Sequence, residues 1–125
     1  MKSWVQSIRQ GRFADIPIFR WNDSAEIAHV FDGYKVAGGT GECAEIAERV
    51  REDRLNGFRS KNILDLWIAL FWNHRMYRHT GSEPSGADLV YLDTLCVALR
   101  DRLLKISMPE RDLLMKSITN HLIPD

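Results

Sequence analysis

The sequence predicts an all-α fold: a single compact bundle of about six helices with a short extended N-terminal strap. Residues 63–72 are apolar at nine of ten positions, and a helix that is apolar on every side must be buried on every side, so other helices have to surround it. Between residues 89 and 106, apolar residues recur at alternating spacings of three and four, which is typical of a helix packed along one seam. The length of 125 residues fits one domain spanning 1–125.

The first expected elements are a short helix and the strap. Residues 2–10 have one apolar face that suits a helix. Residues 13–21 then combine β-branched and aromatic residues with Pro17, which disfavours helix at the position before it. Because this extended segment has no visible partner strand, we expect it to lie over the helices.

Two helices are expected before the central one. Asp23 followed by Glu26 resembles a capping box, and apolar residues recur at helical spacing from there to Tyr34. The second helix carries Cys43 on its apolar face and ends near Gly57, which can adopt the left-handed cap conformation.

Three further helices complete the prediction. The central helix is expected to run from a cap at Ser60 to about His79, and the last helix begins with the capping box of Ser107 and Glu110. Between them lies the helix with the apolar seam. A seam of this kind can pair within the fold or across a two-fold axis, so a homodimer is an open alternative. The residues that would form the dimer contact are Leu89, Leu92, Cys96 and Leu99.

Composition favours a cytoplasmic protein that does not enter membranes. The apolar run is shorter than the roughly 20 residues that span a bilayer, and the first nine residues contain no apolar stretch of the kind found in a secretory signal. Two cysteines, Cys43 and Cys96, do not make a disulfide framework.

No pattern of catalytic or metal-binding residues stands out. Cys43 is expected in the first turn of a helix, where a thiolate is stabilised, but it shares the apolar face of that helix, and Cys96 belongs to the seam. The spacing of the four histidines matches no standard zinc site. We therefore expect no enzymatic activity, no cofactor and no bound metal.

Charge is distributed unevenly although the net charge is zero. Residues 13–48 carry a balance of −5 and residues 49–79 a balance of +4. A basic cluster of this kind is most simply a solvated or internally paired face, but it also suits a protein partner or the phosphates of a nucleic acid. Its members are Arg49, Arg51, Arg54, Arg59, Lys61, Arg75 and Arg78.

Two tryptophans, Trp4 and Trp21, lie near the N-terminus, outside the strongest helical patterns. Tryptophan and arginine dominate the binding energy of many protein interfaces, so these two residues are candidate contacts for a partner. In the alternative interpretation, the strap simply closes the core.

The segment Phe71-Trp72-Asn73, followed after a loop by Asp88-Leu89 and Leu92-Asp93, resembles a pattern in small uncharacterised helical proteins of bacteriophages and mobile elements. The resemblance covers under a third of the chain. It implies an accessory protein without catalytic activity that binds a larger host or defence protein.

Together these patterns predict a non-catalytic regulator or inhibitor that binds another protein. The alternative function is nucleic-acid binding through the basic cluster at 49–79.

Overall fold

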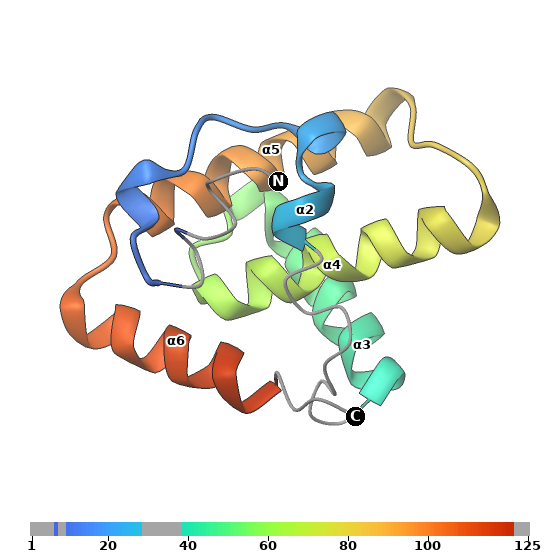
Figure 1. Ribbon diagram of the computed structural model, residues 1–125. Helices are drawn as coiled ribbons and strands as arrows, with labels where there is room; N and C mark the ends of the chain where they lie inside the picture. Colours follow the sequence, from blue (N-terminus) through green and yellow to red (C-terminus); the bar gives the residue numbers. More distant parts are fainter. Residues whose placement is uncertain (1–6, 8–9, 29–38, 122–125) are drawn as a thin grey trace.

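The structure, a computed structural model, describes residues 7, 10–28 and 39–121 (Figure 1). Within these residues there are five α-helices and no strand, which confirms the all-α class, although about six helices were expected. The predicted helix over 2–10 lies almost entirely outside the described residues. The helices are α2 (Ala25–Ala28), α3 (Gly39–Glu52), α4 (Ile63–Thr80), α5 (Gly86–Leu104) and α6 (Met108–His121).

Helix α4 lies in the middle of the fold, in contact with α2, α3 and α5 (Figure 1). Most of its first half is buried, as its apolar sequence predicts: Leu66, Trp67, Ala69 and Leu70 are all 0% exposed. Burial on every side was too strong a prediction, because Leu64 and Trp72 are only half-buried. The indole Nε1 of Trp67 donates a hydrogen bond of 2.6 Å to the carbonyl oxygen of Ile27, so its one polar group is satisfied inside the core.

The cap of α4 differs from the prediction. Asn62 caps the helix: its side chain accepts a hydrogen bond of 2.8 Å from the amide of Asp65. Ser60 lies before the cap, and its amide donates to Asp53. Asparagine and serine are nearly equivalent caps, so the choice between them depends on the turn that precedes the helix. At the other end, Gly81 adopts the left-handed cap conformation with φ of 70°.

The apolar seam of α5 faces the core of its own chain. Leu92, Cys96 and Leu99 are 0% exposed, and Leu89 is half-buried against them. The side chains expected to offer a homodimer contact are therefore occupied by packing against the same chain.

The predicted strap is present in part. Residues 16–20 are non-helical, but they are flanked by two short 3-10 helices, η1 (Phe13–Asp15) and η2 (Trp21–Asp23), where the prediction had extended chain. The strap crosses α5: the carbonyl oxygen of Ile16 accepts from Arg100, and the amide of Trp21 donates to Asp93 at 3.0 Å. Phe13, Ile16, Phe19 and Trp21 close the core, whereas Ile18 points outward at 70% exposure.

The capping box expected at Asp23 does not form, because Asp23 belongs to η2 and α2 begins at Ala25. Ser24 occupies the position before the helix, and its carbonyl oxygen accepts from the amide of Ala28. The continuation of this helix to Tyr34 lies outside the described residues.

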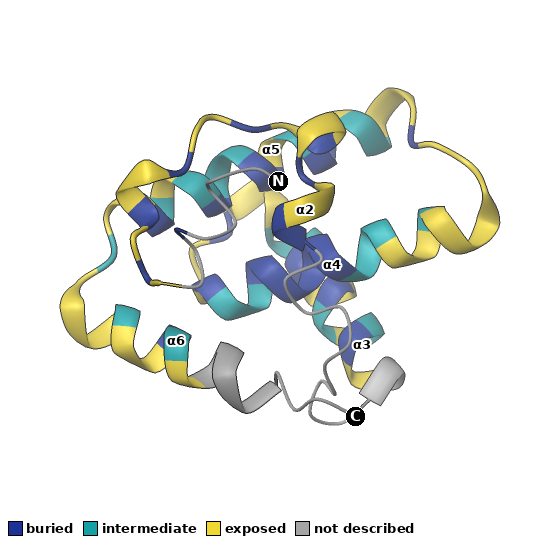
Figure 2. Cartoon of the chain, in the orientation of Figure 1, coloured by how far each residue is buried: buried dark blue, intermediate teal, exposed yellow. Residues whose placement is uncertain are grey.

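Helix α6 lies beside this core (Figure 1). Its predicted capping box is present in part: the Glu110 amide donates to the Ser107 hydroxyl at 3.3 Å, but the Glu110 carboxylate accepts from the same hydroxyl at 3.0 Å, whereas in the full motif it accepts from the backbone amide of the cap residue. Leu114 is buried, but Leu113 is 67% exposed and Met108 60%. Figure 2 shows most of the described surface of α6 as exposed, in contrast to the first half of α4.

Candidate functional site

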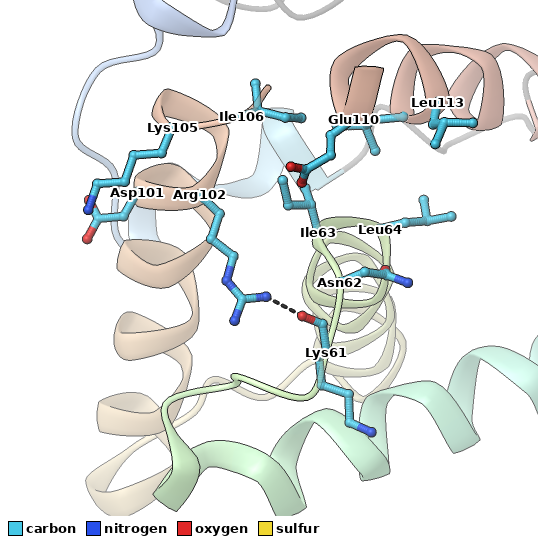
Figure 3. Close-up of a pocket in the computed structure, with 11 residues that line it drawn as sticks. Lys61, Asn62, Ile63, Leu64, Asp101, Arg102, Lys105, Ile106, Glu110 and Leu113 are labelled. Carbon is cyan, nitrogen blue, oxygen red and sulfur yellow. Dashed lines mark hydrogen bonds between the residues drawn. The ribbon is translucent and has the colours of Figure 1, made fainter. Parts of the chain in front are cut away.

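A groove of about 510 Å³ lies where the first turn of α4, the last turn of α5 and the beginning of α6 meet (Figure 3). It is larger than a second hollow near the end of α4, and it combines an apolar floor with charged edges. Its lining residues are Lys61, Asn62, Ile63, Leu64, Asp101, Arg102, Lys105, Ile106, Glu110, Leu113 and Leu114.

The floor of the groove is formed by apolar side chains that differ widely in exposure. Ile63 and Leu114 are buried, at 9% and 5% exposure, while Leu64 and Ile106 are half-buried. Leu113 is 67% exposed and forms part of the α6 wall. An apolar wall that remains in contact with water shows that the groove is open along α6.

Arg102 joins α5 to the turn that precedes α4. Its two terminal nitrogens donate hydrogen bonds to the carbonyl oxygens of Phe58 and Lys61, and Figure 3 shows the bond to Lys61. Phe58 is buried and has a positive φ of 62°, a conformation that costs energy for a non-glycine residue. The guanidinium therefore holds a strained turn in place and is itself held at the edge of the groove.

The charged groups of the groove carry three positive charges against two negative ones. Glu110 accepts a hydrogen bond from Ser107 in the capping box. Asp101 and Lys105 lie one turn apart on α5, at a spacing where opposite charges stabilise each other. Among the described residues, Arg102 forms no ion pair with a carboxylate, and its recorded partners are neutral carbonyl groups.

A second hollow, of about 330 Å³, lies near the end of α4 and brings together two of the predicted contact residues, Trp21 and Arg78. Trp21 is only 8% exposed. Its ring stacks on His74 with centroids 3.7 Å apart and meets Tyr77 edge-on. Trp21 is thus mainly a core residue, and Trp4 lies outside the described residues.

A buried serine, Ser24, pairs with the half-buried His74, which lines this hollow. The Ser24 hydroxyl is 2.6 Å from Nε2 of His74 and 2.9 Å from the carbonyl oxygen of Trp21. The one hydrogen of this hydroxyl can be donated to the Trp21 carbonyl or to Nε2 of His74, so the tautomer of His74 determines the direction of the bond between them. Ser24 is 0% exposed. The arrangement suits a structural contact between α2 and α4.

Three members of the basic cluster have internal partners. Arg51 pairs with Asp88 and lies 4.7 Å above the ring of Tyr91. Arg54 donates to the carbonyl oxygen of Arg51, and Arg49 is 3.5 Å from Glu45. Arg59 and Arg75 are exposed, Arg78 borders the second hollow, and Lys61 is the one cluster member that lines the groove.

Both cysteines are buried thiols. Burial, reinforced by Glu42 and opposed by Arg75, raises the pKa of Cys43 above its ordinary value. Burial raises the pKa of Cys96 to about 12 despite an opposing hydrogen bond from Ser24. A raised pKa keeps a thiol protonated and weakly nucleophilic.

No cluster of three or more histidine, cysteine or acidic residues within the described part of the chain is arranged to hold a metal ion.

Comparison of the chain with protein families, with curated proteins and with solved structures gives no match. In the part of the chain that the structure describes, no helix combines the length and apolar character needed to cross a bilayer.

Sequence patterns pointed to Lys61 but missed the remainder of the groove. One available signal was the run Leu113-Leu114-Met115. Successive residues of a helix are separated by about 100°, so three adjacent apolar side chains cannot all face one core. The identity of the residues across the groove depends on how α6 packs, and local patterns do not determine that packing.

Proposed function

We propose that this protein is a non-catalytic binding module that takes a segment of a larger protein into the groove between α4, α5 and α6, and thereby acts as its regulator or inhibitor. The main support is the exposed apolar wall at Leu113, which lines the same groove as the buried and half-buried side chains of the floor. Burying such a wall against a partner is favourable at about 25 cal/mol for each Å² removed from water.

The shape of the groove favours a protein segment over an enclosed small molecule. Its volume of about 510 Å³ is within the usual range for ligand sites, but such sites normally enclose most of the surface of their ligand, whereas this groove is open along α6. An apolar centre with charged edges is instead typical of a protein interface. The resemblance to phage and mobile-element proteins supports a host or defence protein as the target.

Nucleic-acid binding has less support. This alternative depends on the arginines of the basic cluster, and two of them have partners within the chain. Arg51 contacts Asp88 and Tyr91, and Arg54 donates to a backbone carbonyl. Phosphate contacts require cationic groups that are free to replace counterions. Absence of DNA or RNA binding at low salt would eliminate this alternative.

The proposal is tested by comparing two leucine substitutions. Leu113→Glu places a charge on the groove wall, whereas Leu55→Glu places the same charge on a residue that is 91% exposed and does not line the groove. Each tagged protein is expressed in the native host, and co-purifying proteins are identified by mass spectrometry. We expect a partner that is captured by wild type and by Leu55→Glu but lost with Leu113→Glu. Capture that is equal for all three proteins would contradict the proposed site.

A further inference from the structure

We propose that the segment bound in the groove presents a side-chain carboxylate to the guanidinium of Arg102, next to apolar side chains that contact the floor. This inference rests on the proposed function, because it specifies the chemistry of the partner at the same site. The occupant is an amphipathic segment of another protein in which an acidic residue adjoins leucine-like residues.

Arg102 carries a positive charge that no carboxylate among the described residues pairs with. It is half-buried and charged, yet its recorded partners are the carbonyl oxygens of Phe58 and Lys61, and within the described residues no carboxylate lies at salt-bridge distance. Arginines withdrawn from water are normally paired with an anion. Two carbonyls use two of the five N–H groups of a guanidinium, so donors remain for an incoming carboxylate.

The guanidinium of Arg102 is already oriented in the unbound protein. Hydrogen bonds to two fixed carbonyls hold the guanidinium before a partner arrives, so little side-chain entropy is lost on binding. Figure 3 shows Arg102 extending from α5 toward the turn at Lys61, beside Ile63 at the start of α4. A carboxylate reaching Arg102 is therefore accompanied by an apolar group on the floor.

The residues that line the groove carry a net positive charge. Lys61, Arg102 and Lys105 outnumber Asp101 and Glu110, so the groove favours an anionic occupant over a cationic one. Glu110 is the carboxylate on the α6 wall, and it opposes the binding of a second acid. Its hydrogen bond with Ser107 keeps it in the capping box and not on Arg102.

Two synthetic probes test the inference on the full chain. One is a short amphipathic helical peptide with leucines at positions i, i+3, i+4 and i+7 and a glutamate beside them, and the other has glutamine in place of the glutamate. Amide chemical shifts of Ile63, Ile106 and Leu113 report occupancy of the groove, and titration gives Kd. We expect the glutamate peptide to bind about tenfold more tightly, as removal of one charge-assisted hydrogen bond implies.

Glu110→Gln provides a variant that is expected to fold, because glutamine is also accepted at this position of a capping box. It removes the opposing carboxylate, and we expect the glutamate peptide to bind about threefold more tightly to it while the glutamine peptide is unaffected. Glu52→Gln, on an exposed residue outside the groove, is the matched control and should change neither affinity. Arg102→Met should abolish the difference between the peptides if the variant folds.

The outcomes separate this inference from the proposed function. If both peptides perturb the groove residues with equal Kd, the carboxylate contact is wrong, while the groove remains a protein-binding site. If neither peptide perturbs them, both proposals fail. If dodecanoate binds in the groove and the glutamate peptide does not, the occupant is a lipid acid and the protein segment is wrong.

Discussion

The first half of α4 and the beginning of α6 are both rich in large apolar residues, but they use them differently. Leu66, Trp67, Ala69 and Leu70 are 0% exposed on the helix that contacts α2, α3 and α5. On α6, Leu114 faces inward, Leu113 remains exposed where it lines the groove, and Met108 is exposed as well. The comparison shows that apolar side chains stabilise this fold in one region and provide an open surface in the other.

The largest expected effect comes from placing a charge in the seam of α5. Leu92→Glu puts a carboxylate at a position that is 0% exposed, where no partner compensates its loss of hydration. We expect the chain to lose cooperative unfolding, as measured by circular dichroism and urea titration. A folded monomer that replaced a wild-type dimer would instead place the seam at an interface between two copies.

Trp67→Ala is expected to lower the free energy of unfolding by about 3 to 5 kcal/mol, because it leaves a cavity at the centre of the fold. It also removes the donor to the carbonyl oxygen of Ile27. Urea unfolding of wild type and variant gives the difference. A loss of less than about 1 kcal/mol would mean that the surroundings of Trp67 are not closely packed.

Alkaline pH should destabilise the protein through Tyr91 and Cys96. Burial raises the pKa of Tyr91 to about 12, with Arg51 and Arg54 opposing and Glu48 adding to the effect, and burial raises the pKa of Cys96 to about 12. In the unfolded chain these groups ionise near pH 10 and 9. The folded state therefore holds more protons between about pH 9 and 12, and its stability must fall as pH rises through that range.

Urea unfolding at a series of pH values measures this dependence. Tyr91→Phe should reduce its slope above pH 10, and it also removes a buried hydroxyl for which the described residues supply no hydrogen-bond partner. A free energy of unfolding that stays constant from pH 9 to 11 would show that these groups are not buried as described.

The smallest expected effect belongs to the groove. Leu113→Ala changes an exposed side chain, so the free energy of unfolding should stay within about 0.5 kcal/mol of wild type while partner capture is reduced. The same unfolding assay, run beside Trp67→Ala, makes the comparison direct. A loss as large as that of Trp67→Ala would place Leu113 in the core and contradict an open groove.

Several parts of the structure follow from local sequence patterns. The apolar run at 63–72 determined which helix lies at the centre, and the Ser107–Glu110 pair determined where α6 begins. Gly57 ends the η4 turn (Asp53–Asn56) in the left-handed conformation that its position predicted. These features depend on residues close to each other in the chain, which is why periodicity and capping rules predict them.

Local patterns predicted the capping residues less well, because two candidate caps near the start of a helix stabilise it by similar amounts. Asn62 replaced Ser60 as the cap of α4, and Ser24 replaced Asp23 at the position before α2. In both places neighbouring polar residues are nearly equivalent caps. The turn before α4 engages Ser60 through Asp53, and before α2 Ser24 also contacts His74, which is distant in sequence.

The sequence by itself determined the helical class and the buried centre, because hydrophobic periodicity requires an apolar face to be covered. Only the tertiary structure decided what the charged and aromatic residues do. It paired Arg51 with Asp88, stacked Trp21 on His74 and left Arg102 beside an open groove. The physical reason is that a charge or an aromatic ring suits a core contact, a salt bridge or an interface equally well, and only the groups that packing brings near it select among them.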